Sequence, residues 1–138
     1  MRWSSVLSTQ ADPAVAVGIA LEAIEDQLGD AVVHLLLVFV SGHDDPAWDV
    51  ILAALRGAHP EASILGCSAG GVIGGGREVE GRASISITAG VLPDVAVVPF
   101  HYDAEVSNSH HEAAHWWSEH LGLEPEHQPT FLVIPDPY

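Results

Sequence analysis

The sequence predicts a mixed α/β fold in which a β-α-β-α-β unit is followed by an antiparallel strand pair, a helix and a further strand. Two observations support this class. In the first half of the chain, short apolar runs of strand length alternate with segments of helical periodicity, and strands joined through helices pair in parallel. After a glycine cluster at 66–76, two short runs joined by a tight turn are typical of an antiparallel pair, so the helices should pack on a mixed sheet.

Two helices are indicated by an aspartate followed by proline, at 12–13 and again at 45–46. The aspartate suits the N-cap, and the proline suits the first helical position. Gly29 and Gly57 mark the expected helix ends. Each helix carries an apolar stripe at helical spacing that should face a core. The stripes consist of Val17, Leu21, Ile24 and Leu28, and of Trp48, Ile51, Leu52 and Leu55.

Five runs of strand length accompany these helices. The first three lie at 3–7, 35–40 and 63–67, and the second is continuously apolar, as in a strand covered on both faces. Residues 83–88 alternate apolar and small polar side chains, and residues 94–100 follow a Leu-Pro-Asp turn. We expect these last two runs to form the antiparallel pair.

The last part of the chain predicts a third helix over 109–121, ended by Gly122, and the start of a strand at 131–134. A strand-like run at the very end of a chain has nothing after it to cover it. We therefore expect residues 1–138 to form a single domain that is incomplete at its C-terminus.

Composition restricts the function classes. The 138 residues fit one domain, and an apolar fraction of 48% can supply a core. The formal net charge of −15, from 19 acidic residues against four arginines, repels phosphate backbones and anionic lipid. We therefore expect neither nucleic acid nor a membrane as a partner. The single cysteine, Cys67, and an N-terminus without a secretory signal are typical of a cytoplasmic protein.

The most informative segment runs from Gly66 to Gly76 and holds six glycines directly after a strand. Such a segment allows positive φ and close approach of the backbone to a ligand, and its exposed N–H groups can bind an anionic group. The alternative is a tight corner that leads into the next strand. Arg77 follows at once, and a guanidinium suits bidentate contact with a carboxylate. The candidate ligand-binding residues are Gly66, Cys67, Ser68, Ala69, Gly70, Gly71, Gly74 and Arg77.

Residues 66–70 also match the G-x-S-x-G pattern of a nucleophile elbow, with Ser68 or the adjacent Cys67 as the nucleophile. An elbow needs a helix directly after the turn, and the Val-Ile-Gly-Gly-Gly that follows is a poor helix former. A hydrolase is therefore kept as an alternative hypothesis, and no catalytic residue is assigned.

Residues 111–115 match the H-E-x-x-H pattern of zinc enzymes, with His111 and His115 as candidate metal ligands. The glutamate between them completes a capping box with Ser109, and both histidines lie off the apolar face of the expected helix. Nine histidines in all keep a metal-binding or haem-binding protein among the alternatives, although we expect no cofactor.

The segments 36–43 and 64–80, with Ser8-Thr9 and the final Leu-Val-Ile-Pro-Asp-Pro, resemble the N-terminal region of FIST domains. These are sensory modules of bacterial signalling proteins and of some F-box proteins. Position 71 departs from the pattern, because glycine stands where many relatives carry glutamate. FIST proteins also continue into a FIST C-terminal region, so this chain resembles the leading third of one.

The resemblance implies a domain that senses a small ligand, for which amino acids are the usual proposal. The output would pass to a kinase, a cyclase-like domain or a ubiquitin ligase, and one branch of the family uses haem to sense nitric oxide. We therefore predict a non-enzymatic, small-molecule-binding sensory domain of intracellular signal transduction. Its partners would be the ligand and the remainder of the FIST domain or an output signalling protein. A scaffold that binds another protein is a further alternative.

Overall fold

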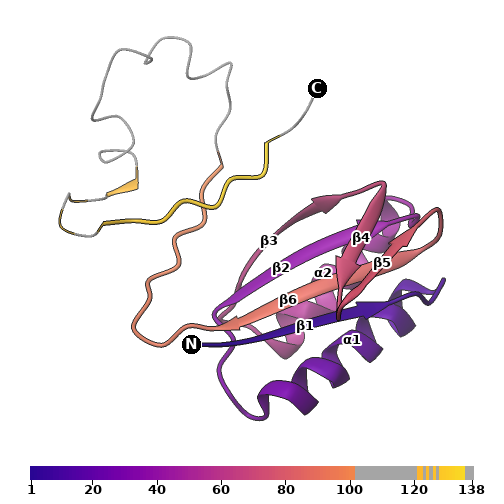
Figure 1. The fold of residues 1–138 in the computed structure, drawn as a ribbon, viewed down its shortest axis with the longest axis horizontal. Helices are drawn as coiled ribbons and strands as arrows, with labels where there is room; N and C mark the ends of the chain where they lie inside the picture. The colour runs from indigo at the N-terminus through magenta and orange to yellow at the C-terminus, as the bar shows by residue number, and fades with distance from the viewer. Residues whose placement is uncertain (102–120, 123, 125, 127, 136–138) are drawn as a thin grey trace, which may run out of the picture. The chain divides into compact units, whose positions relative to one another are not determined.

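The computed structural model describes residues 1–101, 121, 122, 124, 126 and 128–135 (Figure 1). The chain divides into two compact units, Met1–Val97 and Val98–Tyr138. The first unit contains β1 (Arg2–Ser8), α1 (Pro13–Leu28), β2 (Leu35–Ser41), α2 (Pro46–Ala58), β3 (Ser63–Ser68), β4 (Gly71–Gly74), β5 (Arg77–Glu80) and β6 (Ser84–Val91). The predicted mixed α/β class is confirmed.

Four strands form one mixed sheet in the order β1-β6-β2-β3. β2 pairs with β3 in parallel, and β6 lies between β1 and β2 and is antiparallel to both. The strands β1, β2 and β3 therefore run in the same direction, as the β-α-β-α-β pattern predicts. Each helix connects two of these strands, and β3 is left at one end of the sheet.

The expected pairing of residues 83–88 with 94–100 is wrong. β6 already has β1 on one side and β2 on the other, so it has no free edge for a third strand. Residues 95–100 form no strand, and Asp94 adopts a positive φ of 64° in the turn after β6. The antiparallel pair is instead the hairpin of β4 and β5. Its turn residues Gly75 and Gly76 have φ of 55° and 74°, the positive pair that a type I′ turn requires.

Two further predictions fall in the second unit. The helix expected over 109–121 lies outside the described residues except for Leu121, which is helical. The strand expected at 131–134 is wrong, because residues 128–135 form no strand and no described strand pairs with them. A strand exists only where a neighbour supplies ladder hydrogen bonds, and an apolar run alone does not provide one. Phe131 packs edge-on against Phe100, with ring centroids 6.3 Å apart.

The helices pack on one face of the sheet and bury its alternate side chains. Asp12 caps α1 as predicted, since its Oδ1 accepts the N–H groups of Ala14 at 2.8 Å and Val15 at 3.1 Å. Asp45 precedes α2 without a side-chain cap bond, and α2 continues through Gly57 to Ala58. The core includes Val17, Ala20, Ile24 and Leu28 of α1, Ile51 and Leu55 of α2, and Leu36, Val38, Val40, Ile85 and Ile87 of the sheet.

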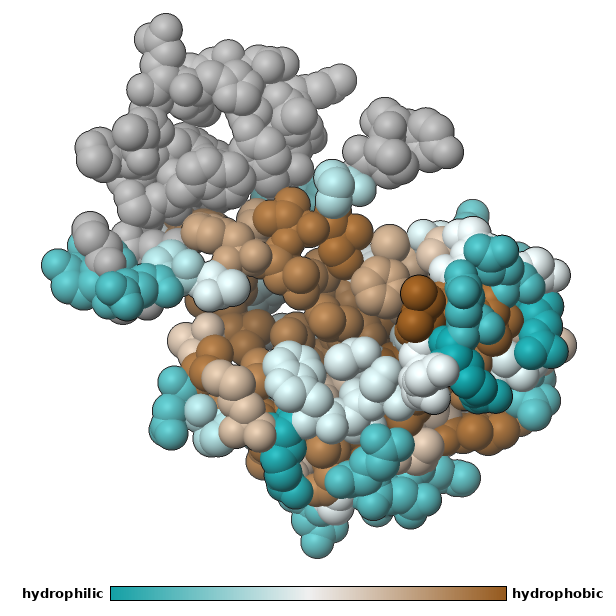
Figure 2. All heavy atoms as spheres, in the orientation of Figure 1, coloured by the Kyte–Doolittle hydropathy of each residue, from teal (hydrophilic) through white to brown (hydrophobic). Residues whose placement is uncertain are grey.

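The β4–β5 hairpin crosses the opposite face of the sheet, in front of β6 and β1 in Figure 1. Three hydrogen bonds hold it there. Ser86 Oγ donates to the Ile73 carbonyl at 2.6 Å, the Gly75 N–H donates to Ser5 Oγ at 3.2 Å, and Arg77 Nη2 donates to the Leu7 carbonyl at 3.2 Å. Over the sheet and hairpin, Figure 2 shows pale and brown side chains in the middle and hydrophilic ones at the rim.

Neither of the two full helices in the described part of the chain has the length and apolar character that a membrane crossing needs.

Candidate functional site

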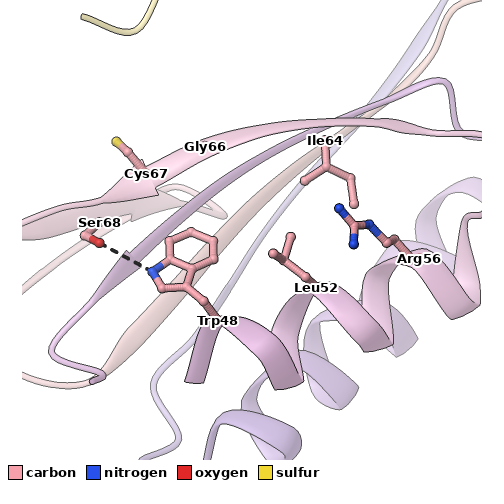
Figure 3. Close-up of a pocket in the computed structure, with 7 residues that line it drawn as sticks. All are labelled: Trp48, Leu52, Arg56, Ile64, Gly66, Cys67 and Ser68. Carbon is pink, nitrogen blue, oxygen red and sulfur yellow. Dashed lines mark hydrogen bonds between the residues drawn. The ribbon is translucent and has the colours of Figure 1, made fainter. Parts of the chain in front are cut away.

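A groove of about 490 Å³ lies between α2 and the edge strand β3 (Figure 3). Its volume falls in the range of about 300–1,000 Å³ that is typical of small-ligand sites. The groove is open along one side because β3 is the last strand of the described sheet. It is lined by Trp48, Leu52, Arg56, Ile64, Gly66, Cys67 and Ser68.

The wall from α2 consists of Trp48, Leu52 and Arg56. These residues are spaced by four, so they lie on one helix face and span roughly 12 Å along its axis. Their neighbours Ile51 and Leu55 are fully buried against the sheet. The groove face of α2 is therefore the border between its buried stripe and its solvent-exposed side.

The wall from β3 consists of Ile64, Gly66 and Ser68, because alternate residues of a strand face the same side. Gly66 leaves the space between the other two side chains free. A Cβ atom at Gly66 would overlap the Val38 carbonyl oxygen of β2, so the close pairing of these strands requires glycine at this position.

The two ends of the groove differ chemically. At one end Trp48 Nε1 donates a long hydrogen bond of 3.4 Å to Ser68 Oγ, and both groups can exchange this bond for contacts to a ligand (Figure 3). At the other end the Arg56 guanidinium points toward Ile64. Arg56 is exposed and makes no hydrogen bond or ion pair with any described residue. Leu52, between these ends, and Ile64, beside Arg56, form the apolar floor of the groove.

The described lining holds no carboxylate and no imidazole. Ser68 therefore has no base of the kind that a serine hydrolase needs among these residues. The chain after Ser68 leads into the β4–β5 hairpin, whereas a nucleophile elbow leads into a helix. Cys67 contributes its backbone to the groove, while its thiol points to the other side of β3 (Figure 3). The thiol is free.

The structure divides the residues that the sequence singled out. Gly66, Cys67 and Ser68 line the groove, whereas Ala69, Gly70, Gly71, Gly74 and Arg77 do not. The Ala69 N–H donates to the Val40 carbonyl at 2.8 Å, and Gly71 pairs with Glu80. Gly74 lies directly against Val6 and Ser86, and Arg77 is bound to β1. Several of these groups already have partners. The groove therefore offers a ligand the side chains of α2 and β3, and not the backbone amides of the glycine-rich segment that the sequence predicted.

Sequence reasoning missed four lining residues, namely Trp48, Leu52, Arg56 and Ile64, as members of a site. Trp48 and Leu52 were assigned to the buried stripe of α2, and continuing that stripe by one turn reaches Arg56. The apolar stripe could therefore have indicated the α2 side of the groove. The open side of the groove could not be predicted in this way, because it depends on β3 being an end strand of the sheet.

The candidate metal ligands His111 and His115 lie outside the described residues. Among the residues that are described, no group of three or more histidine, cysteine, aspartate or glutamate side chains could hold a metal ion. One of the described histidines has a structural contact, since His34 Nδ1 accepts the Leu92 N–H at 3.1 Å.

The fold is a mixed α/β domain with an open groove beside β3, one of the two end strands of the described sheet. The family model of the FIST N domain matches residues 34–138, which include β2, α2, β3 and the hairpin. The chain therefore belongs to the FIST N domain family, whose members are sensory domains of signal transduction. A search of the curated proteins finds no match.

Proposed function

We propose that this domain senses a small metabolite that carries a carboxylate, by binding it in the groove between α2 and β3. One observation supports this most directly: Arg56, which has no partner among the described residues, lines the same groove as Trp48 and Ser68. A guanidinium is suited to bidentate contact with a carboxylate. The ligand body would lie on Leu52 and Ile64, and its far end would contact Ser68.

The charge of the chain favours an amino acid among such metabolites. A formal net charge of −15 repels anions at long range, and this repulsion grows with the charge of the ligand. A zwitterionic amino acid offers a carboxylate at no net charge. The apolar floor of the groove favours an apolar or aromatic side chain over a charged one.

We also place the domain in the cytoplasm. There it would act by binding alone and transmit the bound state to an output signalling domain or protein. The chain after Ser68 leads into the β4–β5 hairpin and not into the helix of a nucleophile elbow, which favours binding over hydrolysis at this groove. Mass spectrometry after long incubation should therefore recover the ligand unchanged, and conversion of the ligand by the wild-type domain would contradict this role.

A thermal-shift panel of the amino acids, followed by calorimetry on those that raise the melting temperature, tests the proposal. A ligand that binds only the folded state stabilises it by RT ln(1 + [L]/Kd), so the melting temperature rises with the concentration of the ligand. Arg56→Gln should weaken binding roughly threefold to thirtyfold, the range expected for a charged hydrogen-bonded contact in an open site. Arg82→Gln is the matched control, because Arg82 is exposed and lies outside the groove. Equal affinities of the two variants, or no shift with any amino acid, would contradict the proposal.

A further inference from the structure

The two end strands of the described sheet, β1 and β3, each pair with one strand only. β1 has further contacts from the β4–β5 hairpin, because the Gly75 N–H donates to Ser5 Oγ and Arg77 Nη2 donates to the Leu7 carbonyl. In the described part of the chain β3 pairs only with β2, so its other edge has no strand against it. Among the described residues the hairpin hydrogen-bonds to β1 and not to β3, so the outer edge of β3 is the more open of the two.

β3 also lacks the features that usually prevent an edge strand from pairing. Proteins protect such edges with charged side chains, proline, bulges or very short strands. The six residues Ser63–Ser68 contain no charged residue and no proline. Six residues offer a ladder of roughly 20 Å, at about 3.3 Å per residue, which is the usual length of a strand in a sheet.

We infer that β3 accepts an extended peptide segment of a partner protein as an additional strand, and that this segment carries an acidic side chain beside Arg56. In strand addition the main-chain hydrogen bonds provide affinity, and alternate side chains provide specificity. The inference goes beyond the binding of a small ligand, because it depends on the backbone of β3 and not on the volume of the groove.

The chemistry of the partner follows from the side chains along the open edge. A strand added about 4.8 Å from β3 would project alternate side chains toward α2, in line with Ile64, Gly66 and Ser68. Trp48 offers an apolar surface to one of these side chains, and Arg56 offers a charge to another. The acids nearest to Arg56 in the sequence, Asp49 and Glu61, form no ion pair with it. An acidic residue on the partner would therefore meet an uncompensated guanidinium.

Fluorescence polarisation with labelled six-residue peptides tests this inference on the whole chain. The probe alternates valine and threonine and has one glutamate on the valine face. Companion peptides carry lysine in place of glutamate, or methyl groups on alternate backbone nitrogens. In 0.15 M salt, which screens the net charge of −15 beyond about 8 Å, we expect the glutamate peptide to bind about tenfold more tightly than the lysine peptide. N-methylation should abolish binding, because it removes ladder donors and leaves the side chains unchanged.

A charge reversal gives the matched comparison. Arg56→Glu should invert the preference, so that the lysine peptide binds more tightly than the glutamate peptide, while Arg82→Glu should leave it as in the wild type. Arg56 is exposed, so the variant should fold, and the N-methylated peptide tests the wild type in any case.

Three results would overturn the inference. The first is binding that survives N-methylation. The second is hydrogen-exchange protection of β3 in the free chain equal to that of β2. The third is self-association that Cys67→Lys abolishes, which would place a second copy on this edge. The amino-acid panel uses no peptide, so its failure and the failure of this test are separable.

Discussion

The glycines after the third strand differ in what each position requires. At Gly66 an added Cβ would overlap the Val38 carbonyl of the neighbouring strand, and at Gly75 and Gly76 a positive φ makes the hairpin turn. At Gly70 an added Cβ would meet nothing within 4 Å, and the residue has no positive φ. The high glycine content of this segment therefore arises from several local constraints on the backbone.

Gly66→Ala should lower the free energy of unfolding, by roughly 1–3 kcal/mol, because the backbone of β2 and β3 must separate to admit the methyl group. Gly70→Ala is the matched control, and we expect it to stay within about 0.5 kcal/mol of the wild type. Urea unfolding followed by circular dichroism measures both. Equal stability of the two variants would show that the close contact at Gly66 is not a constraint in solution.

At the level of elements, the C-terminus of α2 contains a group that links stability to pH. His59 ends the helix by donating its backbone N–H to the Leu55 carbonyl at 2.8 Å. Burial lowers the pKa of its imidazole from the ordinary value of 6.5. As the pH falls through about 6.5, the unfolded chain takes up a proton that the folded chain does not. The free energy of unfolding therefore falls, and this loss ends once the pH is below the folded pKa.

His59→Gln should remove this part of the pH dependence. Between about pH 7.5 and pH 5.5 the wild type should lose more stability than the variant, because the neutral amide does not titrate. The acidic residues are common to both proteins, so the difference between the two curves isolates His59. Unfolding in urea at a series of pH values provides the measurement, and parallel curves would contradict the prediction.

Local signals were sufficient to predict most of the elements. The aspartate-proline pairs and the apolar stripes predicted both helices, because helix formation depends on neighbours three and four residues apart. The insertion of β6 between β1 and β2 was missed, since it joins segments far apart in the chain. Residues 94–100 have the composition of a strand and form none, because both edges of β6 are occupied.

The candidate site was predictable only in part for the same reason. Ser68 and its neighbours were found because the glycine cluster draws attention to that end of β3. Arg56 was missed, because its role depends on which strand ends the sheet, and strand order is a long-range property.

At the scale of the whole molecule, the groove and the open edge meet at the same residue. A bound carboxylate and an added strand would both contact Arg56, so occupation of one would oppose occupation of the other. Mutual exclusion of this kind converts the binding of a metabolite into the release of a partner, with the coupling acting equally in both directions. In this account the sensory domain needs no large conformational change to transmit its signal.

The indole N–H of Trp48 tests the central claim of a ligand site between α2 and β3 most directly. The measurement is a proton–nitrogen correlation spectrum, recorded while the amino acid with the largest thermal shift is added. The Trp48 resonance should move with increasing ligand, because the ligand competes for its bond to Ser68. The resonance of Trp3, which lies on β1 and is 51% exposed, should stay in place. A saturating ligand that leaves Trp48 unmoved would contradict the account.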